Sequence, residues 1–485
     1  MTRALAILAI DLGTTSAKGA LVRLDGSVVS AARRSYPIGI DEANGRAEQD
    51  PRTWWDAVVS ISRELVASDG GTGTHIGAIA VDGHGPTLVA TDATGAVTRP
   101  AITWLDSRAG AELAELSAAT GLRGWALGVL PAALWVERHE SDVASRTCWY
   151  LNTWEYLAFR LSGVARTSLV DGQSLPDVDA LRAAGFDVAR VASPVAAGTV
   201  IGGLTSEAAA ATGITAGTPV VAGVVDAFAS FHGAGLLHPG DGIDTGGMSG
   251  GFGVYTSQPV EAAGSFCTPA PLPGVHVVGG AMAATGRALD WFRDDVLGGV
   301  ATTEALIDEA ARIDPGADGL LFLPYLAGER SPLWDPAARG AFVGLTLRHG
   351  RGHMTRAILE AAALAIRHVA EPIVAAGVDV DVVRVCGGPA QSETWNRIKA
   401  DVTGFTVAVP HVLETAVVGS AIVGAVGIGA FADLPSAIRA MTRIDRVIEP
   451  RDNLRERYDE LYRIYTSIHP AIAPILERRV AAGVR

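Results

Sequence analysis

The stretch ILAIDLGTTSAKGALVRLDG, residues 7–26, decides the fold. Its apolar runs predict two strands, residues 4–11 and 17–24, and Asp25-Gly26 predicts a hairpin turn onto residues 28–30. Between the first two strands lies a bend made of a glycine and three consecutive hydroxyl residues. A polar bend that joins two strands is a known way of holding phosphate, so this stretch predicts a phosphate-binding α/β protein.

The rest of the chain extends this pattern and then repeats it. Helical spacing over residues 53–65 and 108–119 alternates with strand-like runs at 76–81 and 88–91. Later, GIDTGGMSGGFGVY, residues 242–255, repeats the order of strand, Asp-x-Gly and strand. The repeat predicts an internally duplicated fold with two domains, residues 1–246 and 247–485. In the second half, helices are expected at 287–296, 303–312, 353–375 and 393–403, a strand at 382–386, and a pair of surface helices over 453–484.

Composition narrows the class of protein. A chain of 485 residues with 48% apolar and 19% charged residues can bury large cores. It carries 39 basic against 52 acidic residues and has no basic run, so nucleic acid is not an expected partner. Three widely spaced cysteines favour a reducing cytoplasm. The apolar run near residues 421–430 is glycine-interrupted and shorter than the ~20 residues of a membrane span, so no membrane contact is expected.

The first polar bend has the groups that phosphoryl transfer needs. Backbone N–H groups around Gly13 and the hydroxyls of residues 14–16 can cradle phosphates, and Lys18 can offset their charge. Asp11, at the end of a strand, can hold Mg²⁺ through water. The alternative is an ordinary hairpin whose glycine and threonines suit the turn.

Two further glycine-rich segments fit the same chemistry. Residues 244–250, DTGGMSG, predict a second phosphate loop, with a plain linker as the alternative. Residues 387–392, GGPAQS, lie between an expected strand and an expected helix, where bare backbone and a helix N-terminus suit a nucleotide. A simple strand-to-helix turn is the other interpretation.

In this order and spacing, the three segments resemble the FGGY carbohydrate kinases of the actin-like ATPase superfold. The resemblance, xylulokinase-like, covers about residues 7–429. Its most specific part is GAFVGLTLRHGRGHMTRAILE, residues 340–360, supported by residues 322–336 and 286–294. It implies two actin-like (ribonuclease H-like) domains with ATP and sugar in the cleft between them, Mg²⁺, a cytoplasmic enzyme, and a homodimer as an unsurprising state.

The resemblance also assigns roles to residues. Asp226 falls on the catalytic base, which takes the proton of the attacking sugar hydroxyl, and partial burial would raise its basicity. A helix N-cap aspartate is the alternative interpretation. The positions that correspond to ATP contacts are Asp11, Gly13, Thr14, Thr15, Ser16, Lys18, Gly247, Met248, Gly286, Gly387, Gly388 and Ser392.

The sugar side rests on two segments. VDGHGPTLV, residues 81–89, aligns with a loop that reads Gln-Met-His-Gly in xylulokinase-like members, so Gly83 and His84 are expected to contact the substrate. Trp104 and Asp106 belong to a Trp-x-Asp-x-Arg segment that edges the sugar pocket, although a tryptophan is more often core. The expected substrate is a ketopentose such as D-xylulose; ribulose, erythritol, glycerol and gluconate are alternatives.

Four positions depart from the family. Met248 stands where members often have threonine, Gly83 replaces a methionine, Ala132 replaces a signature lysine, and Ala227 follows the base where some relatives have a polar residue. Gly83 and Ala227 are expected to widen or depolarise the sugar pocket. A sugar-binding regulator without catalysis and a partner-driven, actin-like ATPase are the competing hypotheses from other classes.

Overall fold

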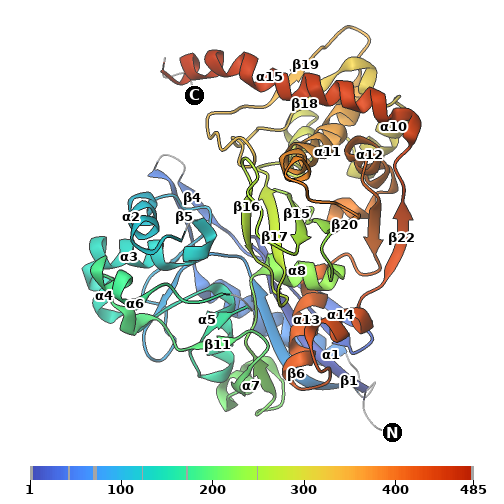
Figure 1. The fold of residues 1–485 in the computed structure, drawn as a ribbon. Coiled ribbons are helices and arrows are strands. Elements are labelled where there is room, and N and C mark those ends of the chain that lie inside the picture. The colour runs from blue at the N-terminus through green and yellow to red at the C-terminus, as the bar shows by residue number, and fades with distance from the viewer. Residues whose placement is uncertain are drawn as a thin grey trace. The chain divides into compact units, whose positions relative to one another are not determined.

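The computed structural model describes residues 4–41, 44–68, 74–122, 124–170, 173–247 and 249–481. The chain forms two compact units, each an α/β fold (Figure 1). Unit 1 comprises Met1–Gly235, Pro271–Pro273 and Thr415–Thr442; unit 2 comprises Leu236–Ala270, Gly274–Glu414 and Arg443–Arg485. The units are therefore not the contiguous stretches 1–246 and 247–485. The reason is that the helix over residues 415–427 packs into unit 1.

Unit 1 is built on a six-stranded sheet whose order is β12-β13-β6-β1-β2-β3. β1, β2 and β3 are antiparallel neighbours, β6 and β13 continue in parallel with β1, and β12 is antiparallel to β13. The strands are β1 (Ala4–Leu12), β2 (Ser16–Arg23), β3 (Val28–Ser35), β6 (Thr74–Gly83), β12 (Val200–Gly203) and β13 (Pro219–Val221).

Strand β1 is apolar from Ala4 to Ile10 because helices cover both faces of the sheet. Leu8 and Ile10 belong to the core that includes Ile61 of α1 (Pro51–Ser68). Ile7 points to the opposite face, where it lies against Gly424 of α13 (Thr415–Gly427). Strands buried on both faces read as continuous hydrophobic runs, as this one does.

Unit 2 repeats the plan of unit 1. Its seven-stranded sheet has the order β16-β17-β15-β14-β20-β21-β22, in which β17, β15 and β14 are antiparallel, β20 and β21 run parallel to β14, and β22 is antiparallel. The strands of the two sheets follow the same order of parallel and antiparallel neighbours, which confirms the predicted duplication. The strands are β14 (Asp241–Asp244), β15 (Gly251–Thr256), β16 (Phe266–Pro269), β17 (His276–Ala281), β20 (Val382–Val385), β21 (Val407–Pro410) and β22 (Ile444–Ile448).

The predicted helices of the second half are present with small shifts. α12 is Glu393–Thr403 as expected, α10 is Thr303–Ala311, and α11 runs over Arg351–Ala375. α9 (Arg287–Trp291) continues into a π-helical turn, Phe292–Val296.

The predicted pair of C-terminal helices was wrong. The structure has one helix, α15 (Arg455–Ala481), seen as a single long red helix in Figure 1. The segment contains two prolines, Pro470 and Pro474, but no glycine or asparagine that could make the turn of a helical hairpin. Within the described residues, no helix has the length and apolar character that crossing a membrane requires.

Candidate active site

The loop predicted to be the first phosphate loop joins β1 to β2, and side chains from outside it fix its shape. Its turn closes when the Gly13 N–H donates to the Ser16 carbonyl at 3.1 Å. The Tyr36 hydroxyl donates to the Gly13 carbonyl, and Gln49 Nε2 donates to the Thr14 carbonyl at 2.7 Å. These bonds hold the loop carbonyls from outside, so the loop is preorganised before any ligand binds. Sequence reasoning missed Tyr36 and Gln49, because neither lies near the loop in the chain.

Three carboxylates lie beside this loop. Asp11 near the end of β1 is paired in register with Asp82 of β6, and Asp226 begins α8 (Asp226–Ala234). Lys18 Nζ lies 4.0 Å from Asp11 Oδ2. Burial, and then the charge of Asp11, raise the pKa of Asp82 well above its usual value. Sequence reasoning missed Asp82, although a carboxylate at the end of an apolar strand was a signal already used for Asp11.

Asp226, the predicted base, lies at the start of a helix in unit 1. It follows β13 through a short connection and occupies the first turn of α8, where the Ala227 N–H donates to its Oδ1 at 2.7 Å. Removal from water, with the Asp11 charge as a second cause, raises the pKa of Asp226 to about 7. A carboxylate with this pKa is half ionised near neutral pH and can accept a proton at little cost.

The histidine of the predicted sugar loop is fully buried. Its Nδ1 lies 3.0 Å from Thr87 Oγ1, and its ring meets Trp54 edge-on at 5.4 Å between centroids. Burial lowers the pKa of His84 to about 3, so the ring is neutral. Among the described residues, Nε2 of His84 has no hydrogen-bond partner, which leaves one ring atom for a ligand.

The space beside Gly83 is occupied. A Cβ at this position would overlap Oγ1 of Thr153, a buried side chain that donates to the His84 carbonyl at 2.9 Å. The expectation that Gly83 widens the sugar pocket is therefore wrong at this position. Thr153 fills the volume that the missing side chain would leave.

The Trp104 segment connects the sugar loop with the phosphate loop. The indole N–H of Trp104 donates to Thr14 Oγ1 at 3.0 Å. The Asp106 carboxylate accepts from the Ala47 N–H at 2.7 Å and from Arg108 Nη2 at 2.6 Å. These bonds hold the segment in place, and the Asp106 side chain is 1% exposed.

The second and third loops lie together in unit 2. β14 and β20 are parallel neighbours with Asp244 opposite Val385, so the loops that follow them leave the same edge of the sheet. A Cβ on Gly387 would lie 3.6 Å from the Gly247 N–H nitrogen, and both glycines have positive φ. Met248 lies outside the described residues.

A small recess in unit 2 is lined by two of the predicted nucleotide contacts of this unit. Gly247 and Gly286 line it with Pro389, which follows Gly387 and Gly388. Asp244 and Lys399 also line it and form a buried ion pair that sequence reasoning missed. Ser392 is the N-cap of α12, and its Oγ accepts from the Trp395 N–H at 3.1 Å.

The fold is a duplicated α/β plan with glycine-rich loops at the ends of the central strands, and unit 1 carries a carboxylate of raised pKa and a buried histidine. The chain belongs to the FGGY family of carbohydrate kinases: the family's N-terminal domain matches residues 6–233 and its C-terminal domain matches residues 245–428. It is therefore a sugar kinase of the xylulokinase-like type.

Named relatives agree on the class and differ in substrate. Xylulose kinase of Escherichia coli is 32% identical, with 82% of this chain and 84% of that protein covered. Gluconokinase of Bacillus subtilis is 30% identical, with 86% of each covered. The crystal structure of xylulose kinase from Rhodospirillum rubrum has a TM-score of 0.80 at 32% identity, covering 97% of this chain and all of that chain, 100%.

The segment over residues 340–360 has a structural role in this chain. Glu360 Oε1 accepts hydrogen bonds from the Gly316 N–H at 2.8 Å, from Arg356 Nε at 2.7 Å and from the Tyr458 hydroxyl at 2.8 Å. This buried network ties α11 to α15. The α11 end of the segment therefore belongs to the core of unit 2, whereas residues 343–348 are exposed.

Proposed function

We propose that the chain transfers the γ-phosphoryl group of ATP to a hydroxyl of a ketopentose, D-xylulose being the first candidate. The carrying observation is the Asp226 carboxylate, whose pKa of about 7 suits a general base at neutral pH. Asp226 takes the proton of the attacking hydroxyl while the oxygen attacks the γ-phosphorus and ADP leaves.

The groups beside Asp226 support an uncharged sugar. His84 is neutral, and its Nε2 can bond a sugar hydroxyl. Arg108, the cation of the Trp104 segment, forms salt bridges with Asp106 at 2.6 Å and with Glu48 at 2.7 Å. Trp104 and the Gly83 backbone would border the sugar, and Asp106 would act by holding the Trp104 segment.

Each unit has its own set of predicted contacts with ATP. Thr14, Thr15 and Ser16 would hydrogen-bond its terminal phosphates, and Lys18 would offset their charge. Gly247, Gly286, Gly387 and Gly388 offer backbone without side chains, and Ser392 marks the N-terminus of α12.

The residues present fit Mg²⁺ held chiefly by phosphate. No group of three His, Cys, Asp or Glu among the described residues has the arrangement of a metal site. Mg²⁺ in phosphoryl-transfer sites needs only one or two carboxylates besides phosphate and water, and Asp11 supplies such an oxygen. When bound, the ion would neutralise charge on the transferring group.

The test is an assay of ADP release with Mg-ATP against a panel of ketoses, polyols and aldonates. D-xylulose should stimulate ADP release by the wild type. The Asp226→Asn variant should release ADP about 10²–10⁴-fold more slowly while still binding ATP. ATP binding without stimulation by any member of the panel would overturn the proposal and favour the regulator hypothesis.

Gluconate is the second candidate because of the match to gluconokinase. Binding of an aldonate would require a cation in the sugar pocket to pair with the carboxylate of the ligand. ADP release that is stimulated by gluconate and not by D-xylulose would assign gluconate as the substrate. The same panel tests ribulose, erythritol and glycerol as substrates.

A further inference from the structure

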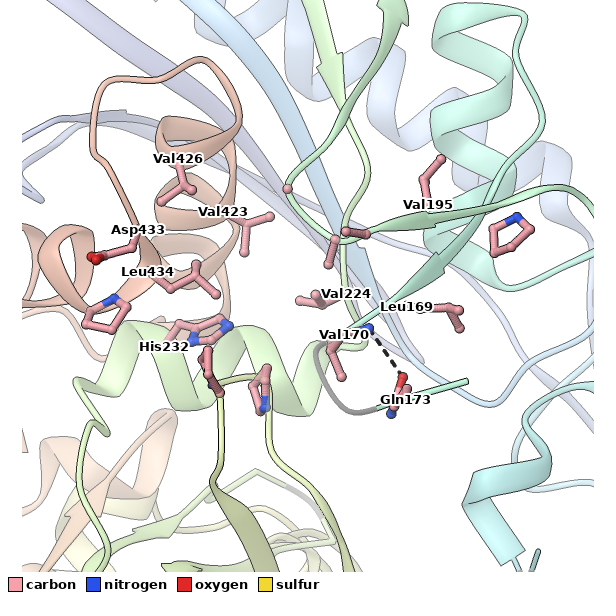
Figure 2. Close-up of a pocket in the computed structure, with 17 residues that line it drawn as sticks. Leu169, Val170, Gln173, Val195, Val224, His232, Val423, Val426, Asp433 and Leu434 are labelled. Atoms are coloured by element: carbon pink, nitrogen blue, oxygen red, sulfur yellow. Dashed lines mark hydrogen bonds between the residues drawn. The ribbon is translucent and has the colours of Figure 1, made fainter. Parts of the chain in front are cut away.

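Unit 1 contains a cavity of about 500 Å³ whose lining includes none of the residues assigned to the kinase reaction (Figure 2). Its walls come from α8, α13, the start of α14 (Leu434–Met441), and the turn that links β11 (Pro194–Ala196) to β12. Of the 17 lining residues drawn in Figure 2, only Gln173, His232 and Asp433 have polar side chains. The cavity is thus strongly apolar and within the size range of small-molecule sites.

His232 is the exceptional residue in this lining. Its side chain is completely buried, at 0% exposure, and within the described part of the chain neither ring nitrogen has a hydrogen-bond partner. Buried polar groups in folded proteins are nearly always bonded, so an imidazole left with two open positions beside a cavity indicates a partner inside that cavity.

The cavity is separate from the reacting groups. His232 lies six residues beyond Asp226 on α8, which is about 9 Å along the helix axis and turned by roughly 240°. None of the residues assigned to the sugar, the phosphates or the proton transfer lines it.

The polarity of the lining selects the ligand. Burial lowers the pKa of His232 to about 4, so the ring is neutral and presents one donor and one acceptor. Asp433 accepts hydrogen bonds from Ser436, which lower the pKa of its carboxyl and keep it charged. A negative charge in the wall disfavours an anion.

We propose that this cavity is a binding site for a small, uncharged, apolar molecule that carries one hydroxyl group, as an alkylphenol does. The apolar body would replace water against Val423, Val426 and Leu434. The hydroxyl would form one hydrogen bond with a ring nitrogen of His232, either directly or through one water.

The probes are 4-propylphenol and propylbenzene, which differ only in the hydroxyl. Binding to the full chain is measured by calorimetry and by saturation-transfer NMR. The phenol should bind about 3- to 10-fold more tightly, the value of one net hydrogen bond between neutral groups. In His232→Leu, propylbenzene should still bind and the preference for the phenol should disappear.

A second variant tests the location. Val426→Phe fills the cavity and should weaken both probes at least about tenfold; Leu434→Phe serves if that variant does not fold, as judged by its melting temperature. Phenol binding that is unchanged in both His232→Leu and the filled variant would overturn the proposal. Failure of both probes to bind the wild type would overturn it as well, with water as the occupant.

Discussion

Ser420 of α13 donates a hydrogen bond to Oδ2 of Asp82 at 2.5 Å, although the two residues are 338 positions apart. Both side chains are buried. The bond fixes a late helix of the chain to the end of β6, directly beside Asp11.

Ser420→Ala should weaken this attachment. Removing the donor leaves the Asp82 carboxyl without that bond in a buried place, so the free energy of unfolding should fall by about 1–3 kcal/mol. Urea denaturation followed by tryptophan fluorescence measures it. Ser467→Ala, at an exposed position of α15, is the control and should change stability by less than about 0.5 kcal/mol. Equal stability of the Ser420 variant and the wild type would contradict the role of this bond.

The rate should depend on the ionisation of Asp226. Because the base must be deprotonated, kcat/KM should rise about tenfold per pH unit below its pKa of about 7 and level off above it. Asp11→Asn removes the second cause of the raised pKa, so its acidic limb should move to lower pH even where its maximum rate is reduced. Profiles from pH 5.5 to 9 at constant ionic strength test both points; a flat wild-type profile would rule out Asp226 as the titrating base.

The Asp226 carboxylate should also lower the free energy of unfolding at neutral pH. Its folded-state pKa of about 7 lies above the ordinary value of 3.8, so the folded protein binds the proton more tightly and loses stability as the pH rises from about 4 to 7. A tenfold difference in proton affinity between the folded and unfolded chains corresponds to about 1.4 kcal/mol. Asp226→Asn should therefore increase the free energy of unfolding at pH 8 by a few kcal/mol, seen as a higher melting temperature. At pH 3.5 the substitution should have little effect.

The comparison for this effect is Asp308→Asn, which removes an exposed carboxylate of α10. It should leave the difference between the two pH values as in the wild type. A melting temperature of Asp226→Asn that is lower than the wild type at pH 8 would contradict the assignment of the raised pKa.

The contact between α8 and α13 depends on glycine. A Cβ at Gly419 would overlap the Ala229 carbonyl, and one at Gly233 would overlap the Thr415 carbonyl. Gly419→Ala should therefore cost about 1–3 kcal/mol, because backbone must move. Gly110→Ala, where a Cβ meets nothing within 4 Å, should be neutral or slightly stabilising. Equal effects of the two substitutions in urea denaturation would show that the helices do not need close approach.

Much of the site is local in the sequence and was predicted from it. Strand, bend and strand occur within residues 4–23, and the same plan recurs after Asp241, because alternation and turn residues act over a few positions. Asp226 and His84 stand beside apolar runs that mark strand ends. The sequence thereby determined the class of enzyme and the duplicated α/β plan.

Tertiary structure decided what lies beside those segments. α13 joins unit 1, Thr153 fills the space at Gly83, Tyr36 and Gln49 hold the first phosphate loop, and Asp82 meets Asp11. Each of these contacts joins residues that are distant in the chain, so no local period or motif specifies them. They exist because packed helices and strand register bring particular side chains within reach, and burial beside another carboxylate is also what raises the pKa of Asp82.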